Sequence, residues 1–404
     1  MKVKGAIMRI LAIPSSYGLS APISGGQNRF AQLVEMQVAN GNHVIVLEPN
    51  SYRSHDDTQD AEVHYSKEGQ LTGKWTTAFR DMNPGFEWRL WTLLKRTAPD
   101  IVEFGHPSGM TVCGILARLE KKRPVFVYAA HNVEADFADE AYQKDSSHGS
   151  VRKRLNTLYA SFLERVVCGY VADHVTSIST KDRARFIQKY GLRASKVTAI
   201  NPARRILPPL SPEARTRLRQ EFGIRPEQVA VVFVGARSHV PNAEAAAAIE
   251  DLIAPAVIAK DGRARFIIAG AGFPIATRKN VNYVGYVKRI QDLLMSSDVA
   301  IAPIEHGAGV KLKVIDYMAA GLAILSTRKG IEGIDAIEGE HVVVVDHVDH
   351  KFLEALVELV GSPERRARLG RGARNFAAAQ YDWDRTRKEA GDLYGRLVRE
   401  ASLR

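Results

Sequence analysis

One stretch of the chain, residues 305–321, joins a glycine-containing loop to the start of a predicted helix. The loop carries Gly307 and Gly309, and the helix carries Lys311 and Lys313 on its first turn. Short apolar runs of the kind that form buried strands precede and follow this stretch. This order is typical of a parallel sheet, and it brings free backbone N–H groups and the positive end of a helix to the carboxyl edge. The sequence therefore predicts an anion site at that edge, where open parallel sheets hold phosphorylated ligands.

Side chains on the predicted helix indicate what this site binds. Lys313, at the helix start, can pair with a diphosphate, and Asp316 can accept hydrogen bonds from ribose hydroxyls. The alternative is that Lys313 and Asp316 form a solvated pair on one face of the helix, which is common. Leu312, Ile315 and Met318 or Ala319 recur at helical spacing and should face the core, whereas Tyr317 lies on the same stripe as Lys313 and Asp316. The residues that we assign to this site are Gly307, Ala308, Gly309, Val310, Lys311, Lys313 and Asp316.

The chain of 404 residues is long enough for two domains. Apolar segments alternate with helical ones from residue 9 to residue 200, which is typical of a parallel sheet covered by helices on both faces. A proline-rich stretch, residues 201–212, interrupts the pattern, and strand-like runs begin again at residue 229. We therefore predict the α/β class, with two doubly wound parallel-sheet domains, residues 1–207 and 208–382, and a cleft between their carboxyl edges.

Cysteine usage and the lack of long apolar segments indicate a compartment. Cys113 and Cys168 lie in apolar segments without metal-ligand spacing, which favours free thiols in a reducing compartment. Charge interrupts the first residues before any long apolar run, and no stretch is apolar for long enough to span a bilayer. We expect a cytoplasmic protein.

The net charge of +11 would suit a polyanionic partner. The basic residues are scattered, however, and they lack the aromatic-interleaved platform or recognition helix of nucleic-acid-binding proteins, so we expect no nucleic-acid partner. Residues 74–96 mix three tryptophans with basic residues. This pattern fits either peripheral contact with an anionic membrane or an ordinary amphipathic helix packed on the sheet.

In the first domain, candidate site residues follow the predicted strands. Gly25 and Gly26 open a helix after the first strand, and His131 and Asn132 follow the strand at residues 125–130. His106 follows the strand at residues 100–104. Glycine pairs before helices also serve as simple turns, and a lone histidine at a strand end is often structural. Their shared place at a carboxyl edge favours contact with a substrate.

In the second domain, the loop after the strand at residues 229–234 holds Gly235 and Arg237. An arginine here can stabilise a diphosphate leaving group as its charge develops, or it can simply solvate the loop. Asn242, a few residues later, fits the N-cap of the next helix, so we predict a structural role for it.

Taken together, these motifs resemble glycosyltransferase family 4, whose members have the GT-B fold of two Rossmann-like domains. The resemblance runs over nearly the whole chain, and its most specific part is the block from Gly307 to Gly333. The other matching segments are Gly25-Gly26, His131–Glu134, Leu163–Arg165, Ala172–Ser179, Val234-Gly235, Pro241-Asn242 and Tyr381–Trp383.

The resemblance implies an enzyme of polysaccharide biosynthesis or a related pathway. Such an enzyme moves a sugar from a nucleotide-sugar donor to a hydroxyl of a glycan, a lipid-linked glycan or a small molecule, with retention of configuration and without a metal or other cofactor. The first domain would bind the acceptor and the second the donor, and a terminal helix, residues 383–404, would cross back to the first domain. His131, Arg237 and Lys313 would be catalytic, Gly235 would join the donor site, and Gly25, Gly26, Asn132 and His106 would line the acceptor side.

The chain departs from the family pattern at two places. The usual pair of glutamates eight positions apart is replaced by Ala308 and Asp316, although a sub-group with a similar glycine and lysine run also lacks the first acid. The family often has an arginine and a lysine after the first strand of the second domain. Arg237 matches the arginine, and Lys311 and Lys313 are the candidates for the place of the lysine.

Two other functions share these features. A nucleotide-sugar epimerase or hydrolase of the same fold would turn over the donor without an acceptor. A catalytically silent subunit would bind the nucleotide sugar without turnover, and Asp316 in place of glutamate is its support in the sequence. A dinucleotide oxidoreductase is disfavoured, because no Gly-x-Gly-x-x-Gly run follows the first strand.

Overall fold

The computed structural model describes residues 7–14, 25–49, 62–66, 84–107, 110–144, 150–307 and 309–403. The chain forms two compact units. Unit 1 comprises Met1–Ala203 and Asp384–Arg404, and unit 2 comprises Arg204–Trp383. The chain therefore passes into unit 2 at Arg204, slightly before the boundary expected between residues 207 and 208.

Unit 1 is built on a seven-stranded sheet with the order β3-β2-β1-β4-β5-β6-β7, in which every neighbouring pair is parallel. Its strands are β1 (Arg9–Ile13), β2 (His43–Pro49), β3 (Glu62–Ser66), β4 (Ile101–Phe104), β5 (Val125–Ala129), β6 (His174–Ser177) and β7 (Val197–Ala199). The central strands are short runs of β-branched and aromatic residues and are buried along their length, as the continuous apolar pattern predicts.

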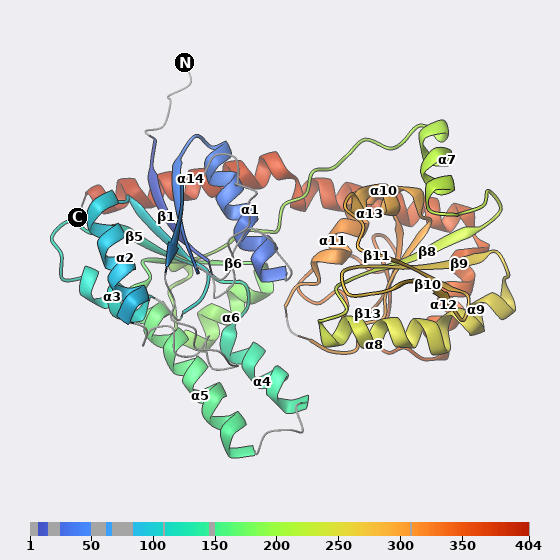
Figure 1. The fold of residues 1–404 in the computed structure, drawn as a ribbon, viewed down its shortest axis with the longest axis horizontal. Helices are drawn as coiled ribbons and strands as arrows, with labels where there is room; N and C mark the ends of the chain where they lie inside the picture. The colour runs from blue at the N-terminus through green and yellow to red at the C-terminus, as the bar shows by residue number, and fades with distance from the viewer. Residues whose placement is uncertain are drawn as a thin grey trace. The chain divides into compact units, whose positions relative to one another are not determined.

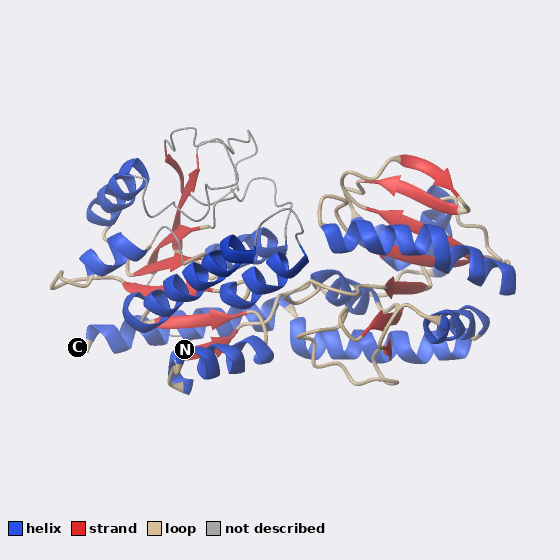
Figure 2. Cartoon of the chain, turned by 90° about the horizontal axis from the view of Figure 1, so that it is seen from below, coloured by secondary structure: helices blue, strands red, loops and turns tan. Residues whose placement is uncertain are grey.

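Helices cover both faces of this sheet, as Figures 1 and 2 show. They are α1 (Gly25–Ala39), α2 (Pro84–Thr97), α3 (Thr111–Ala117), α4 (Glu134–Lys144), α5 (Ser150–Val166), α6 (Thr180–Tyr190) and α14 (Trp383–Ser402). A π-helical turn, η3 (Val167–Val171), extends α5, and a short 3-10 turn, η4 (Ala194–Lys196), leads into β7. The basic and tryptophan-rich segment expected within residues 74–96 contributes α2, while its residues before Pro84 lie outside the described part of the chain.

Unit 2 contains a second seven-stranded sheet with the order β10-β11-β9-β8-β12-β13-β14. Its strands are β8 (Val229–Val234), β9 (Ala264–Ala269), β10 (Ile275–Arg278), β11 (Val281–Gly285), β12 (Val299–Ala302), β13 (Ala323–Thr327) and β14 (Val343–Val345). Only the pairing of β10 with β11 is antiparallel among the described strands of this sheet. Strands β10 and β3 were not predicted, since both are edge strands without a continuous apolar run.

The helices of unit 2 are α7 (Pro212–Glu221), α8 (Val240–Ala248), α9 (Ala254–Lys260), α10 (Ile290–Ser296), α11 (Leu312–Ala320), α12 (His350–Gly361) and α13 (Pro363–Tyr381), with a π-helical turn, η5 (Ile249–Ile253), between α8 and α9. The predicted α/β class with two parallel-dominated, helix-covered sheets is thus confirmed. Within the described ranges, no helix combines the length and the apolar character that crossing a bilayer requires.

The strand order places a switch point in each sheet. In unit 1 the first strand, β1, lies between β2 and β4, and in unit 2 the strand β8 lies between β9 and β12. The connections on the two sides of such a strand leave in opposite directions, so the loops at its carboxyl end leave space for a ligand. The predicted site residues lie in the loops that follow β1, β4 and β5 in unit 1 and β8 and β12 in unit 2.

Most of the terminal helix α14 belongs to unit 1, and polar contacts hold it there. Asn40, at the end of α1, donates to the carbonyl of Arg387 at 3.0 Å and accepts a hydrogen bond from the Arg387 guanidinium at 2.8 Å. Further along, the Tyr394 hydroxyl donates to the fully buried carboxyl of Glu103 in β4. Burial raises the pKa of Glu103 to about 7, although Tyr394 and Arg29 oppose that shift.

Candidate functional site

Three loops meet at the carboxyl edge of unit 2. Gly235 follows β8, and a Cβ atom at this position would lie 2.6 Å from Cγ of Asn242 and 2.8 Å from Nζ of Lys313. Gly270, after β9, packs on the same loop, since its Cβ would fall 1.9 Å from the carbonyl oxygen of Gly235. Only glycine fits these two positions without a displacement of backbone or of Lys313. The predicted residues Gly235 and Lys313 therefore lie together.

Lys313 occupies the second position of α11, and its ammonium group points back over the end of β8. Nζ donates to the side-chain oxygen of Asn242 and lies 4.4 Å from the ring centre of Phe233. Loss of hydration around the ammonium group, followed by repulsion from Lys311, lowers the pKa of Lys313 to about 7. A lysine held in this way near neutral pH gains strongly from a nearby anion.

Lys311 precedes α11 and folds its side chain onto the glycine loop. Nζ donates to the carbonyl oxygen of Gly307 at 2.5 Å and to that of Gly309 at 2.7 Å. Gly307 and Gly309 have φ values of 100° and 79°, in the left-handed region that favours glycine. Lys311 thus holds the shape of the loop, and the first N–H groups of α11 have no acceptor within their own helix. The positive charge of Lys311 and the free backbone N–H groups of α11 therefore lie at the same end of the helix.

Asp316 lies one turn into α11 and is already paired. Its carboxylate accepts hydrogen bonds from the guanidinium of Arg204, from Nε and, at 3.3 Å, from Nη2. Arg204 is the first residue of unit 2, and its backbone forms a bridge to the end of α13: its N–H donates to the carbonyl of Tyr381 at 2.6 Å and its carbonyl accepts from Trp383 at 3.0 Å. Any ligand that binds this carboxylate would therefore share it with Arg204.

Other predicted residues of unit 2 take varied places. Arg237 is exposed in the loop after β8, while Val310 packs against the hydrophobic core. Ala308 lies outside the described residues. The N-cap prediction for Asn242 is wrong: α8 begins at Val240, and Asn242 donates to the carbonyl of Ala236 at 3.0 Å and accepts from Lys313.

The helix faces also differ from prediction at one residue. Tyr317 is fully buried rather than directed at a ligand, and its hydroxyl accepts a hydrogen bond from the N–H of Val234 at 2.8 Å. This contact ties α11 to the end of β8, because a buried hydroxyl needs a partner and the last N–H of the strand supplies one. Tyr317 therefore positions the helix on which Lys313 and Asp316 lie.

Positive charge gathers around these loops. The pKa of His239 is lowered, first by loss of hydration and then by repulsion from Lys313 and Lys311, with a smaller contribution from His306. Crowding of like charge is unfavourable unless an anion joins them, so this edge of unit 2 is suited to a negatively charged group.

In unit 1, His131 is the most constrained of the predicted residues. It is 7% exposed, and the position of a Cβ on Gly26 would lie 3.1 Å from its ring, while one on Gly105 would lie 3.0 Å from Nε2. Neither ring nitrogen has a hydrogen-bond partner among the described residues. Burial, with smaller contributions from Arg29 and His106, lowers the pKa of His131 to about 3. A neutral imidazole with two unsatisfied nitrogens is therefore held at this edge, at a cost that a bound hydroxyl would offset.

Two carboxyl groups, those of Glu134 and Glu164, meet at the start of α4, three residues after His131. Glu164 accepts hydrogen bonds from the hydroxyls of Tyr128 at 2.9 Å and Tyr190 at 2.5 Å, and from the N–H of Glu134 at 3.1 Å. Burial and then repulsion from Glu164 raise the pKa of Glu134 to about 8. The Glu134 carboxyl lies 3.7 Å from Nε2 of His106. Glu134 is therefore largely protonated at neutral pH and can donate a hydrogen bond.

The remaining predicted residues of unit 1 are near this cluster. His106 and Asn132 are half-buried, and Gly25 is the first residue of α1, next to Gly26. Glu134 and Glu164 lie in segments that carry the family resemblance, but they were not predicted as site residues. Arg204 was not predicted either, although two adjacent arginines in a proline-rich segment are a usable signal of a specific contact.

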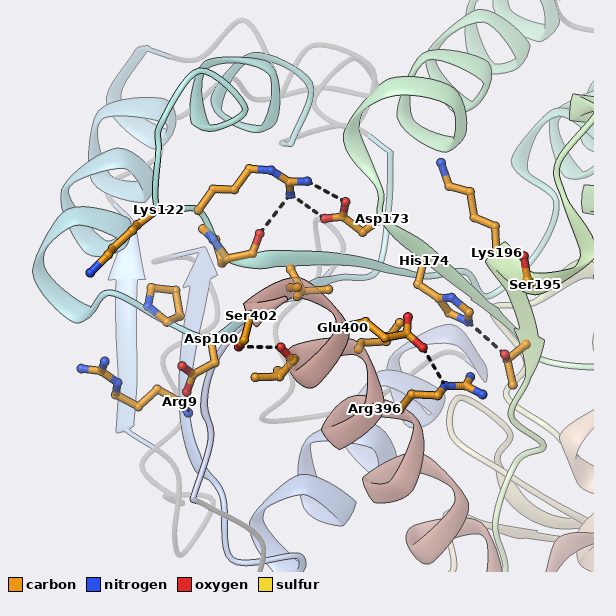
Figure 3. Close-up of a pocket in the computed structure, with 18 of the residues that line it drawn as sticks. Arg9, Asp100, Lys122, Asp173, His174, Ser195, Lys196, Arg396, Glu400 and Ser402 are labelled. Carbon is orange, nitrogen blue, oxygen red and sulfur yellow. Dashed lines mark hydrogen bonds and ion pairs between the residues drawn. The ribbon is translucent and has the colours of Figure 1, made fainter. Parts of the chain in front are cut away.

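Outside the predicted site, the features that bear on function are a cavity and any side-chain groups that could hold a metal ion. A cavity of about 1290 Å³ opens at the opposite, amino edge of the unit 1 sheet, and none of the predicted site residues lines it (Figure 3). Over the part of the chain that the structure describes, no group of three or more His, Cys, Asp or Glu side chains is arranged to hold a metal ion.

The sequence matches two family profiles that adjoin along the chain. Residues 23–204 match the family described as Glycosyltransferase Family 4, and residues 228–362 match the family described as Glycosyl transferases group 1. A relative, the putative glycosyltransferase EpsD of Bacillus subtilis (strain 168), is 26% identical over 307 residues, which are 73% of this chain and 76% of that protein.

Solved structures share the fold at low sequence identity. Sucrose-phosphate synthase from Thermosynechococcus elongatus superposes with a TM-score of 0.76 at 16% identity, over 97% of this chain and 100% of that one. WaaG, a glycosyltransferase involved in lipopolysaccharide biosynthesis, gives 0.71 at 17% identity, over 95% and 98%. Anabaena HepE, solved with UDP and glucose, gives 0.68 at 14% identity, over 96% and 99%. These likenesses confirm the predicted GT-B fold.

Proposed function

This chain belongs to the group 1 glycosyl transferases of glycosyltransferase family 4, and we propose that it moves a sugar from a nucleotide-sugar donor to a hydroxyl acceptor with retention of configuration. The acceptor would be a glycan, a lipid-linked glycan or a small molecule. The observation that carries the proposal is the meeting of Lys313, Gly235 and the start of α11 at the switch point of unit 2.

The donor diphosphate fits this meeting point chemically. The N–H groups at the start of α11 and the loop at Gly307–Gly309 supply backbone donors, and the helix end adds partial positive charge. Lys313 supplies a positive charge, because its pKa, lowered to about 7 in the free protein, would rise when a diphosphate is bound. Arg237, exposed in the neighbouring loop, supplies a second cation that can reach a ligand.

Recognition of the nucleoside follows from Asp316. A carboxylate accepts hydrogen bonds from two hydroxyl groups, and the ribose of a nucleotide presents such a pair. Because Asp316 also binds Arg204, we expect the ribose to share the carboxylate or to displace the guanidinium. Val310 would contribute packing rather than a polar contact, since it lies against the core.

Cleavage of the donor would proceed by stabilisation of the leaving group. The bond between the anomeric carbon and the phosphate oxygen breaks, and the electron pair leaves with the nucleoside diphosphate, where Lys313 and Arg237 meet the developing charge. The acceptor hydroxyl forms its new bond on the same face of the sugar and loses its proton to the departing phosphate. Positioning and electrostatics would supply the rate, without a metal.

The edge of unit 1 would handle neutral hydroxyl groups. His131, neutral and with both nitrogens unsatisfied by the described residues, would hydrogen-bond the transferred sugar. Gly26 leaves room for its ring, while Asn132 and His106 would line the acceptor side. Glu134, which is protonated at neutral pH because its pKa is raised to about 8, adds a donor.

A donor screen followed by a transfer assay tests this function. UDP-, GDP- and ADP-sugars are added separately, and the melting temperature is recorded, because a ligand that binds the native state stabilises it. UDP-sugars come first, because HepE was solved with UDP-glucose. The stabilising donor is then incubated with glycan, lipid-linked and small-molecule acceptors, and the configuration of the product is read by NMR. Inversion would contradict the proposed stereochemistry.

The same assay separates the alternatives. Donor turnover without acceptor at a rate comparable to transfer would identify a hydrolase or an epimerase. Donor binding without turnover against the whole acceptor panel would identify a silent binding subunit.

A further inference from the structure

A cavity of about 1290 Å³ lies at the amino edge of the unit 1 sheet, on the far side from His131. The starts of β5, β6 and β7 and the last turns of α14 form its walls, and Figure 3 shows Lys196, His174 and Arg396 on one side of the end of α14. A strand of five residues such as β5 spans about 16 Å. A molecule in this cavity is therefore too far away to take part in the chemistry at the carboxyl edge.

Positive charge dominates the walls of the cavity, with nine Lys and Arg side chains against four Asp and Glu. The carboxylates are already engaged. Asp173 accepts hydrogen bonds from Arg123 at 2.7 and 2.9 Å, Asp100 accepts from the N–H of Arg9 at 2.7 Å, and Glu120 pairs with Lys95 at 2.5 Å. Six lining cations have no carboxylate partner within the described ranges, namely Arg9, Lys121, Lys122, Arg183, Arg193 and Lys196.

The cations crowd most closely where β6 and β7 begin. Burial lowers the pKa of Lys196, and repulsion from Arg118 and Arg193 lowers it further, against opposing contributions from Cys168 and Asp173. His174 is 2% exposed, and burial, followed by repulsion from Arg396 and Lys196, lowers its pKa to about 4. Its Nε2 atom lies 2.9 Å from the hydroxyl of Thr198. Glu400, at 4.0 Å from Arg396, compensates only part of this charge.

We propose that this cavity is a second anion site, which binds a phosphate monoester or diphosphate group beside Lys196 and Arg193. Guanidinium groups match the paired oxygens of phosphate, and a lysine adds a compact charge, so this set suits a group with three or more oxygens. The bound anion relieves the mutual repulsion of the cluster. Its source is either the headgroup of an anionic lipid or a free phosphorylated molecule. The site is independent of the proposed transfer reaction.

Calorimetric titration of inorganic pyrophosphate into the full chain tests the proposal. The background is Lys313→Met, which removes the lysine of the proposed donor site and so leaves the second site to be measured. We expect one pyrophosphate site in this background and about tenfold weaker binding after Lys196→Met, which keeps the length of the side chain but removes its charge. Lys196→Arg restores the charge and should restore the binding.

Lys388→Met is the matched control, because Lys388 is exposed on α14 and does not line the cavity. Arg193→Gln, at an exposed position, provides a second variant if Lys196→Met fails to fold, and it should weaken binding in the same direction. Loss of all pyrophosphate binding in Lys313→Met alone, or an equal effect of Lys196→Met and Lys388→Met, would overturn the proposal.

Vesicles distinguish the two sources. The chain is sedimented with phosphatidylcholine vesicles that contain phosphatidylglycerol, with and without pyrophosphate. Binding that pyrophosphate displaces and that Lys196→Met removes assigns the site to a lipid headgroup. Pyrophosphate binding without vesicle binding assigns it to a free phosphorylated molecule.

Discussion

The carboxyl edges of the two sheets have similar backbones but different electrostatics. At the edge of unit 2, Lys313 and Lys311 lie close enough for their charges to interact, both disfavour protonation of His239, and the pKa of Lys313 is lowered to about 7. At the edge of unit 1, the pKa of His131 is lowered to about 3 and that of Glu134 is raised to about 8, so both groups are neutral at pH 7. One fold thus presents a cationic edge and an uncharged polar edge.

Under the proposed function, this difference would let two similar domains handle different parts of one reaction. A diphosphate carries charge and gains most from cations and helix ends, whereas sugar hydroxyls are neutral and are best met by uncharged donors and acceptors. Burial alone produces an uncharged polar edge, because it disfavours the charged forms of histidine and glutamate alike. The predictions below test whether the two edges are as different in function as they are in charge.

The largest effect should come from Lys313→Met, which removes the charge from the unit 2 edge and keeps the length of the side chain. We expect transfer to fall by about a hundredfold to a thousandfold, since one preorganised donor at a developing charge commonly contributes that much. Steady-state kinetics and donor calorimetry check this. Lys260→Met, at an exposed position on α9, is the control. Unchanged donor affinity and rate would remove Lys313 from the site.

A smaller effect should follow His131→Leu, which removes both nitrogens from the unit 1 edge while nearly conserving volume. Transfer should fall by up to about tenfold, because the loss of a neutral hydrogen bond removes up to about 1.5 kcal/mol of stabilisation. The melting temperature should hold or rise, because two unsatisfied buried nitrogens disappear. Kinetics and thermal melts of the same preparation distinguish a substrate-binding role of His131 from a structural one. A lower melting temperature with full activity would indicate a purely structural histidine.

The pH dependence of donor affinity should show whether the charge of Lys313, at the unit 2 edge, controls donor binding. The pKa of Lys313 is about 7 in the free protein, and a bound diphosphate raises it. Binding therefore takes up a proton above pH 7, and donor affinity should fall as pH rises through 7, by at most about tenfold per unit. Calorimetry at pH 6, 7, 8 and 9 measures the slope. Lys313→Arg stays charged and should flatten it, whereas an unchanged slope in that variant would assign the proton to another group.

The smallest effect should come from a chelator. If cations of the chain alone stabilise the leaving group, EDTA should change the rate of transfer by less than about twofold, because no Lewis acid is removed. The assay is run with EDTA and then with added Mg²⁺ or Mn²⁺. Abolition by EDTA and recovery with one of these ions would show that the cationic edge of unit 2 is not sufficient.

The sequence predicted those parts of the fold and site in which neighbours along the chain determine the structure. The strand, glycine loop and helix at residues 305–321 are local, and so are the histidines that follow the buried strands. Asn242 was misassigned, because its partner Lys313 lies 71 positions away and only the packed sheet brings them together. Arg204 and Asp316 are 112 positions apart. The charges of His131 and Glu134 follow from burial, which no local motif encodes.

Arg204 has a practical consequence for building chimeric enzymes. The chain enters unit 2 at Arg204 and leaves it at Trp383, and backbone hydrogen bonds join these two crossing points. The Arg204 guanidinium also pairs with the carboxylate of Asp316 in α11. A crossover placed in the proline-rich stretch after Arg204 would separate the arginine from the aspartate with which it is matched. Recombination between relatives should therefore cut before Arg204 and after Trp383, so that Arg204 and its partners Asp316, Tyr381 and Trp383 all come from one parent.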